Sequence, residues 1–182
     1  AAGELVAAGF ELDTTHVMTA RAVRASAAPR GIELRPLTPD ELARAAELVF
    51  AIGNGRSEAY RQFLHRRAAW QRDLVTRGLA RFWGAFEDET LVGSLGLVRL
   101  GDDRRGTRLG RYQDVQTAPS HRRRGIAGAL LAVAAAEVVT AGIEPLVIKT
   151  GSGSEAERVY ERVGFRTIER TVSACREPPI NG

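Results

Sequence analysis

The alternation of hydrophobic and polar residues predicts a series of strands and helices that begins near residue 32. Residues 32–35 alternate apolar and charged side chains, as expected for a half-buried strand. Residues 38–41 (Thr-Pro-Asp-Glu) combine an N-cap residue, a first-turn proline and a capping-box glutamate, which predicts a helix start. This helix is expected to end at the glycines of 53–55, and a second helix, capped by Ser57, extends to Gly78.

The apolar pattern then changes from helical to strand-like spacing. Residues 82–86 and 91–97 are largely apolar stretches on either side of an acidic turn at 87–89, which predicts a β-hairpin. Glycines and aspartates at 101–106 mark another turn, after which residues 108–117 are expected to form a third antiparallel strand. Three strands in direct sequence predict a meander.

The last third of the chain predicts two helices that alternate with two strands. Residues 125–141 are small or apolar at nearly every position, which indicates a helix buried against a sheet. Residues 145–148 form a short apolar strand, residues 154–162 a helix that ends at Gly164, and residues 165–174 a closing strand. The order β-α-α-β-β-β-α-β-α-β predicts an α/β fold with a mixed sheet and helices on its faces.

The composition excludes several functional classes. The chain has 182 residues, of which 44% are hydrophobic and 26% charged, so one domain with a single core is expected. Cys175 is the only cysteine, and the three histidines are scattered, which argues against a disulfide framework and a metal site. The longest apolar run, 126–136, is about half of the roughly 20 residues that a bilayer span needs. We therefore expect a cytoplasmic protein without membrane insertion or secretion.

The division of the chain is expected to follow its composition. Residues 1–30 are interpreted as an N-terminal extension and linker, residues 31–177 as the folded domain, and residues 178–182 as a tail. Residues 20–30 hold small and basic residues without a sustained apolar period, which is typical of a connection. Because the chain starts at Ala1 instead of methionine, we expect it to be processed or part of a longer polypeptide.

One short internal echo bears on the extension. Residues 5–10 (LVAAGF) and the strand-like stretch after them resemble residues 160–165 (YERVGF) and the strand that follows. The echo rests on one glycine and one phenylalanine, and coincidence is the alternative. If the echo is real, the extension is the tail of a preceding, similar module.

The basic segment 117–127 (TAPSHRRRGIA) carries the strongest chemical signal. A strand leads into a basic turn, and the turn opens the buried helix. The first N–H groups of a helix have no internal partner and small residues let an anion approach them, so the segment is suited to a pyrophosphate. With a net charge of +4 and 26 basic residues, of which Lys149 is the only lysine, the chain favours an anionic partner.

Two alternatives for this segment stay open. The arginines can be a solvated basic turn, with the small residues serving close packing. They can also contact nucleic-acid phosphates, although no aromatic residue lies in the run to stack on bases. A separate Gly-x-Gly-x-x-Ala pattern at 151–156, with Glu169 eighteen residues after Gly151, fits the fingerprint of a dinucleotide-binding domain. Only one strand can follow this pattern before the chain ends, which is too few for a dinucleotide-binding fold.

Two motifs together resemble a known family. Residues 122–127 (RRRGIA) are similar to the Arg/Gln-x-x-Gly-x-Gly/Ala signature of the GCN5-related N-acetyltransferases, and residues 156–165 (AERVYERVGF) to their downstream Ala-x-x-x-Tyr-x-x-x-Gly-Phe segment. The resemblance covers about residues 32–176. It implies a mostly antiparallel, twisted sheet with helices on both faces, acetyl-CoA as donor, and transfer of its acetyl group to an amine.

The resemblance also implies roles for individual residues. The strand segment Val115, Gln116 and Thr117 is expected to bind the pantetheine arm, and the backbone of Arg122, Arg123, Arg124, Gly125, Ile126 and Ala127 the pyrophosphate. Tyr160 coincides with the family tyrosine, whose phenol protonates the departing thiolate or hydrogen-bonds to it, and Ala156 leaves room for the cofactor. A half-buried structural tyrosine is the alternative for Tyr160.

The chain departs from the family pattern at two positions. Gln113 stands where relatives carry a glutamate, so Asp114 is the candidate base; the alternatives are that it orients the substrate or pairs with an arginine such as Arg111. Gly153 replaces an asparagine of many members, which leaves one cofactor contact open.

The expected function is direct acetyl transfer from acetyl-CoA to an amine-bearing small molecule or peptide. Substrate choice is expected to depend on the helices of 40–78 and on the turn at 101–106. A non-catalytic module on the same fold, which senses acyl-CoA or binds nucleic acid, is the alternative. The acceptor is not readable from the sequence, and a homodimer is left open.

Overall fold

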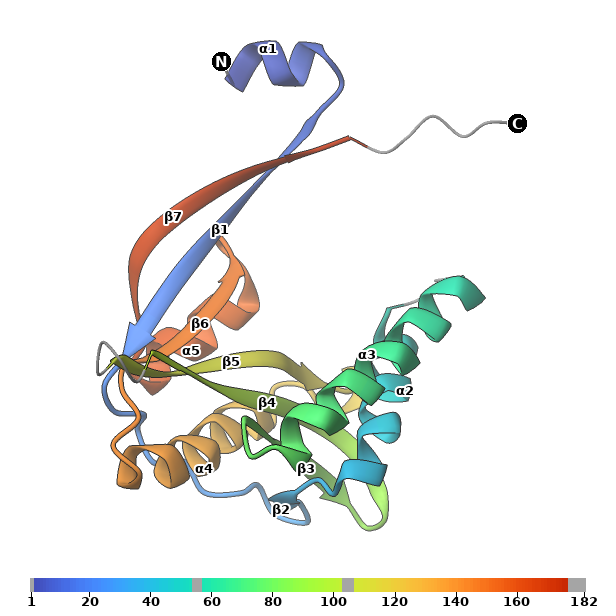
Figure 1. Cartoon of the computed structure of the whole chain (residues 1–182), viewed down its shortest axis with the longest axis vertical. Helices are drawn as coiled ribbons and strands as arrows, with labels where there is room; N and C mark the ends of the chain where they lie inside the picture. The colour runs from blue at the N-terminus through green and yellow to red at the C-terminus, as the bar shows by residue number, and fades with distance from the viewer. Residues whose placement is uncertain (1, 54–56, 103–106, 177–182) are drawn as a thin grey trace.

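A seven-stranded mixed sheet organises the part of the chain that the computed structural model describes, namely residues 2–53, 57–102 and 107–176 (Figure 1). The turn predicted at 101–106, the glycine-rich break at 53–55 and the tail at 178–182 lie wholly or partly outside the described residues. In chain order the elements are α1 (Ala2–Ala7), β1 (Glu11–Ala20), β2 (Glu33–Pro36), a 3-10 turn (Pro39–Glu41), α2 (Leu42–Ile52), α3 (Glu58–Thr76), β3 (Ala80–Glu87), β4 (Thr90–Asp102), β5 (Thr107–Thr117), a second 3-10 turn (Pro119–His121), α4 (Ile126–Thr140), β6 (Leu146–Gly151), α5 (Glu155–Val163) and β7 (Arg166–Cys175).

The predicted order of elements from β2 to β7 is confirmed. Strands β3, β4 and β5 form the expected antiparallel meander, and the sheet order is β2-β3-β4-β5-β6-β1-β7. Every neighbouring pair is antiparallel except β5 and β6, so the sheet is mixed and mostly antiparallel, as the fold prediction requires.

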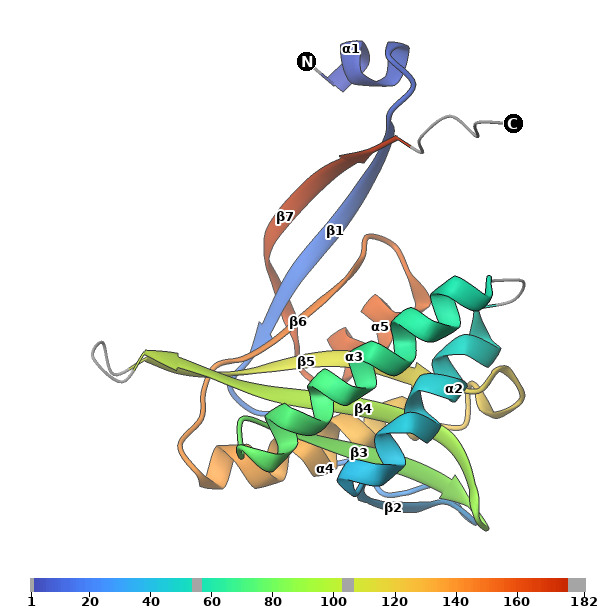
Figure 2. The ribbon, with the colours of Figure 1, turned by 45° about the vertical axis from the view of Figure 1, so that its right-hand side comes forward.

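The N-terminal strand β1 lies inside this sheet, between β6 and β7. It pairs with β6 from Thr15–Gly151 to Ala20–Leu146, and with β7 along nearly its whole length. Figures 1 and 2 show β1 and β7 continuing beyond the rest of the molecule as a two-stranded arm, with α1 at its far end. The sheet therefore takes in residues 11–20, which the sequence assigned to an extension.

Each face of the sheet carries its own hydrophobic core, because neighbouring strand residues point to opposite faces. On one face α2 and α3 cover strand residues such as Phe82 and Phe86. On the other face α4 covers Trp83, Ala85 and Leu95, with α5 beside it (Figure 2). The helix α4 is small or apolar at nearly every position and buries more than half of its residues against the sheet and its neighbours, as its composition predicted.

The predicted helix boundaries follow local hydrogen bonds. The Glu41 side chain accepts from the Thr38 N–H at 3.0 Å, which completes the reciprocal capping box. Arg35 also binds this carboxylate, and its hydrogen bond lowers the pKa of Glu41 to about 2. Ser57 caps α3 by accepting from the Tyr60 N–H. Within the described residues, no helix combines the length and the apolar composition needed to cross a membrane.

Candidate active site

A cleft opens where β5 and β6 separate. In the described part of the chain the two strands pair only at Gly110–Leu146 and Arg111–Val147, although β5 continues to Thr117. The remainder of β5 therefore has an unpaired edge toward β6. The cleft has a volume of about 1180 Å³. It is lined by Ser26, Ile52, Val115, Gln116, Thr117, His121, Arg122, Arg123, Gly125, Ile126, Ala127, Gly128, Glu155, Ala156, Arg158, Val159, Tyr160, Glu161, Arg162 and Val163.

The N-terminus of α4 faces this cleft. The first backbone bond of the helix runs from the Ala129 N–H to the Gly125 carbonyl at 3.1 Å. The N–H groups of residues 126–128 precede it and so have no partner within the helix, and all three residues line the cleft. Unpartnered N–H groups and the helix dipole together attract an anion.

The turn before α4 adds to this anion site through its backbone conformation. Arg123 and Gly125 adopt φ values of +60° and +85°. Positive φ values in a tight turn can direct successive N–H groups toward one side, an arrangement that binds anions. The left-handed Gly125 is favoured at this position because glycine lacks a Cβ. From the sequence, a left-handed conformation could have been inferred for Gly125 but not for Arg123.

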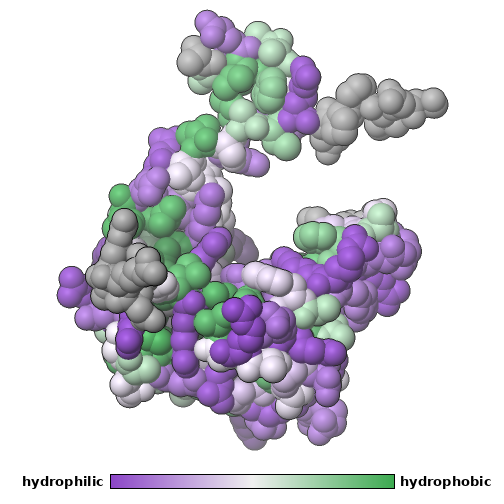
Figure 3. All heavy atoms as spheres, in the orientation of Figure 1, coloured by the Kyte–Doolittle hydropathy of each residue, from purple (hydrophilic) through white to green (hydrophobic). Residues whose placement is uncertain are grey.

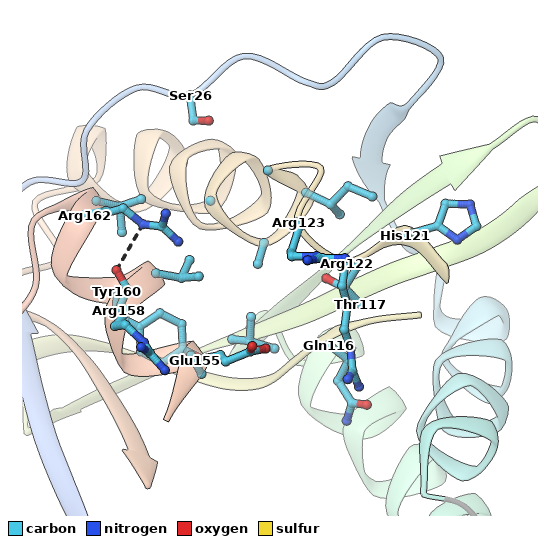
Figure 4. Close-up of a pocket in the computed structure, with 18 of the residues that line it drawn as sticks. Ser26, Gln116, Thr117, His121, Arg122, Arg123, Glu155, Arg158, Tyr160 and Arg162 are labelled. Atoms are coloured by element: carbon cyan, nitrogen blue, oxygen red, sulfur yellow. Dashed lines mark hydrogen bonds between the residues drawn. The ribbon is translucent and has the colours of Figure 1, made fainter. Parts of the chain in front are cut away.

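The arginines around the cleft divide into two groups. Arg122 and Arg123 lie on one side of it in Figure 4, and Arg158 and Arg162 on the other. The predicted ligand Arg124 does not line the cleft, because its guanidinium donates to Glu87 at 2.8 Å. Glu87 also contacts His121, and the hydrogen bonds from His121 and Arg124 lower the pKa of Glu87.

Tyr160 reaches the cleft from α5. The helix presents Ala156, Val159, Tyr160 and Val163 to this side, a spacing of three and four residues that places them on one face. Tyr160 is 5% exposed, and burial raises its pKa to about 12. The phenol is therefore neutral throughout the physiological pH range and can donate a proton into the cleft.

Asp114 lies on the opposite face of the sheet from the cleft and contacts α3. Its carboxylate accepts from the Gln71 amide at 2.7 Å and forms an ion pair with Arg67 at 3.2 Å. Asp114 has a φ of +52° and lies where the β4–β5 register shifts, opposite Ser94 to Gly96. A non-glycine residue in this region is uncommon and marks an irregular strand. The predicted catalytic pair is thus split, with Tyr160 in the cleft and Asp114 on the α2–α3 face.

The segment between β6 and α5 is held by a contact with the N-terminal strand. The predicted ligand Gly153 does not line the cleft, because its N–H donates to Glu157 at 2.6 Å. The second carboxylate oxygen of Glu157 contacts His16 Nδ1 at 2.5 Å. The His16 hydrogen bond, followed by that from Gly153, lowers the pKa of Glu157. His16 of β1 therefore fixes the start of the helix that carries Ala156 and Tyr160.

Replacing Glu157 with glutamine should destabilise the protein near pH 7 and lower its thermal unfolding midpoint by several degrees. A carboxylate whose pKa is lowered by folding stabilises the protein above its ordinary pKa, and this contribution disappears as the pH falls through the lowered value. The difference from the parent should therefore shrink below about pH 4.3, the ordinary pKa of glutamate. Thermal melts between pH 3 and pH 8 measure it. Glu155→Gln in the same helical turn is the control, and an equal loss there would contradict the assignment.

Several lining residues escaped the sequence prediction. Ser26 comes from the connection after β1 and Ile52 from the end of α2, and nothing local in the sequence places either beside the cleft. Arg158 and Arg162 lie four residues apart on the helix that carries Ala156 and Tyr160, so the motif had already identified the helix on which they share a face. Among the described residues, no group of three or more metal-ligating side chains gathers.

Comparison with known proteins agrees with this architecture. The Acetyltransferase (GNAT) domain family matches residues 38–175. An uncharacterized N-acetyltransferase, YsnE of Bacillus subtilis, is 34% identical over 100 residues, which span 53% of this chain and 63% of that relative. The match thus spans less than two thirds of the relative's length.

Solved structures share the fold. A predicted acetyltransferase of Clostridium acetobutylicum, determined with acetyl-CoA, superposes with a TM-score of 0.62 at 15% identity, and the match covers 76% of this chain and 92% of that one. A Drosophila protein gives a TM-score of 0.62 at 16% identity over 92% of this chain and 52% of its own. Because the family match covers most of the chain and includes every residue of the cleft except Ser26, the chain belongs to the GNAT family of acetyltransferases.

Proposed function

We propose that this chain transfers the acetyl group of acetyl-CoA directly to the amine of a small molecule or peptide. One observation carries the proposal: the unpaired edge of β5 and the unpartnered N–H groups of α4 open into the same cleft. An extended amide-containing arm that ends in a pyrophosphate fits such a cleft, because a strand edge pairs with amides and a helix N-terminus with phosphates. Acetyl-CoA supplies the activated thioester carbonyl there.

The backbone of residues 115–117 holds the pantetheine arm in this proposal. These residues lie in the unpaired part of β5, so their peptide groups are available on the side toward β6. An N–H group from this edge that points at the thioester oxygen stabilises the negative charge that develops on it during attack. The anion site at 122–128 holds the other end of the donor and so fixes the position of the thioester along the strand.

Tyr160 protonates the sulfur that leaves. As the amine nitrogen bonds to the carbonyl carbon, the carbon–sulfur bond breaks and its electron pair remains on sulfur. Tyr160 lines the cleft, and its raised pKa keeps the proton on the phenol until a thiolate forms beside it. The attacking amine loses its own proton to water or to a nearby base.

Asp114 positions the acceptor in this proposal and does not act as the base. Both of its oxygens are engaged, one by Gln71 and one by Arg67. These three residues also line a small cavity between α2, α3 and the sheet, on the side where the acceptor would enter. Gln113, the residue before Asp114, has a buried side-chain amide nitrogen without a hydrogen-bond partner among the described residues.

We expect Asp114→Asn to raise the acceptor KM several-fold without changing the shape of the pH profile. Loss of the carboxylate weakens the contact with Arg67 and loosens the helix that borders the acceptor side. Initial rates at varied acceptor concentration from pH 6 to pH 10 measure both quantities. Asp73→Asn, on the exposed side of α3, is the matched control. A shifted basic or acidic limb in the Asp114 variant would make this residue the base.

Release of free thiol from acetyl-CoA tests the proposed reaction. The protein is incubated with acetyl-CoA and a panel of amines that includes polyamines, amino sugars, amino acids and peptide N-termini. Amine-dependent thiol release, with the acetylated amine identified by mass, supports acetyl transfer. Tight acetyl-CoA binding without thiol release across the panel would instead support an acyl-CoA sensor.

A further inference from the structure

Two segments at opposite ends of the chain have the same local structure. Helix α1, Gly9, Phe10 and β1 follow one another as α5, Gly164, Phe165 and β7 do. Both glycines are left-handed, with φ values of +81° and +116°. The N–H of Phe10 donates to the carbonyl five residues earlier at 3.0 Å, and the N–H of Phe165 does the same at 3.0 Å. The echo in the sequence is thus matched by the same hydrogen bond and a left-handed glycine at both helix ends, although Ala8 separates α1 from Gly9 and no residue separates α5 from Gly164.

The two units are also paired with each other about a two-fold axis. With Gly9 matched to Gly164, Thr15 corresponds to Arg170 and His16 to Thr171. The β1–β7 ladder pairs Thr15 with Thr171 and His16 with Arg170, so exchanging the units exchanges these two pairs. The neighbouring pairs Thr14–Val172 and Val17–Glu169 are exchanged in the same way. Beyond Val17 a bulge shifts the register by one residue, and the symmetry is local to the centre of the arm.

The surroundings of the two units differ sharply. Phe165 is fully buried and α5 packs on α4, whereas α1 contains no buried residue. The unit at the N-terminus therefore has the structure of a closing helix and strand without the core that such a unit normally covers. A six-residue helix on a two-stranded ribbon buries too little apolar surface to be stable by itself.

Apolar side chains remain uncovered on the same arm. Val6 of α1 is 56% exposed, and Ile168 and Val172 of β7 are 65% and 59% exposed. Figure 3 shows hydrophobic residues over α1 and along the arm. Among the described residues β7 pairs with β1 alone, so its other edge offers unpaired backbone groups. An apolar, unpaired strand edge is a surface that another strand covers in folded proteins.

We propose that residues 2–20 are the closing unit of a second GNAT-like module that precedes them in the same polypeptide, and that this module docks on the arm. The two-fold relation fixes the geometry. In this chain β1 lies between β6 and β7, so β7 lies between β1 and the corresponding strand of the second module. β6 pairs with residues 15–20 of β1, and the second module's strand accordingly pairs antiparallel with residues 170–175 of β7.

A second copy of this chain fits the surface less well. Its own β6 is already paired with its own β1, so a second copy can offer only the outer edges of its β7 and β2, and neither corresponds to the β6 partner that the two-fold relation requires. The solved structures point the same way. The Drosophila protein matches 92% of this chain, so the match must include part of the first 30 residues. That protein is about twice as long as the region matched. By contrast, the Clostridium structure matches only 76% of this chain, and the match takes up 92% of the length of that protein.

Amide hydrogen exchange tests the proposal without relying on acetyl transfer. The 182-residue chain is compared with the same chain extended at its N-terminus to the natural translation start. We expect the amides of residues 2–10 and 170–175 to exchange about tenfold or more slowly in the extended chain, because they gain a core and a strand partner. Equal exchange rates in the two proteins would overturn the proposal.

A matched pair of substitutions separates docking from a general loss of stability. Val172→Arg should lower the thermal midpoint of the extended chain by several degrees and leave that of the 182-residue chain nearly unchanged. Val139→Arg, at an exposed valine of α4, should have the same small effect in both. Equal effects of Val172→Arg in both would contradict docking. A stable dimer of the 182-residue chain with protected β7 amides would assign the surface to a second copy and overturn the proposal as well.

Discussion

Replacing Ala127 with glutamate should raise the KM for acetyl-CoA by about a hundredfold while the protein stays folded. Ala127 lies in the first turn of α4 and lines the cleft, so a carboxylate there faces the proposed pyrophosphate. Two unit charges about 4 Å apart in a partly buried site repel by about 4 kcal/mol, enough for this change even after partial screening. A glutamate in the first turn of a helix favours the helix itself, so stability should be retained.

Binding measurements separate this effect from a defect in chemistry. Isothermal titration with CoA and initial rates at varied acetyl-CoA should show the same loss of affinity, with a smaller loss at high salt. Ala136→Glu places the same charge on an exposed position of the same helix and is the matched control. An unchanged KM for acetyl-CoA in the Ala127 variant would show that the pyrophosphate does not bind at the N-terminus of α4.

Tyr160→Phe should lower kcat about ten- to a hundredfold with little change in the donor KM, because proton transfer to the leaving sulfur is lost while the ring still fills its place. Burial raises the pKa of Tyr160 to about 12, so the parent enzyme should show no rate loss from this phenol below about pH 11. Steady-state kinetics with an acceptor found in the amine panel measure both constants.

A second buried tyrosine provides the control. The Tyr112 phenol donates to the Leu131 carbonyl at 2.9 Å inside the core, where it serves packing. Tyr112→Phe should cost about 1 kcal/mol of stability, typical of one buried hydrogen bond, and leave kcat nearly unchanged. If Tyr160→Phe behaves like Tyr112→Phe, Tyr160 is a structural residue.

Local sequence signals were sufficient for most of the fold. The capping residues at 38–41, Ser57 and Gly164 end or begin helices where predicted, because these signals depend on neighbouring residues alone. The insertion of β1 between β6 and β7 could not be read in this way. It depends on pairing between residues more than a hundred positions apart, and strand alternation does not name the partner.

The candidate site could be predicted only in part, because some side-chain positions depend on partners that are distant in the sequence. The residues themselves pointed to the turn before α4, the family resemblance added residues 115–117 and the motif on α5, and the structure brings all three segments to one cleft. In the structure, however, Arg124 binds Glu87 instead of lining the cleft. Asp114 is likewise engaged by Gln71 and Arg67. An arginine or aspartate in a motif can turn to either side of its strand or loop, and only the tertiary partner decides which.

The place of β1 has a practical consequence for how the protein can be shortened. The family match begins at residue 38, so a truncation guided by it would remove β1 and His16 together. β6 and β7 would then each present a bare backbone edge, and Glu157 would lose its imidazole partner. Such a trimmed protein should aggregate through those edges and misplace the start of α5, although every motif residue is still present.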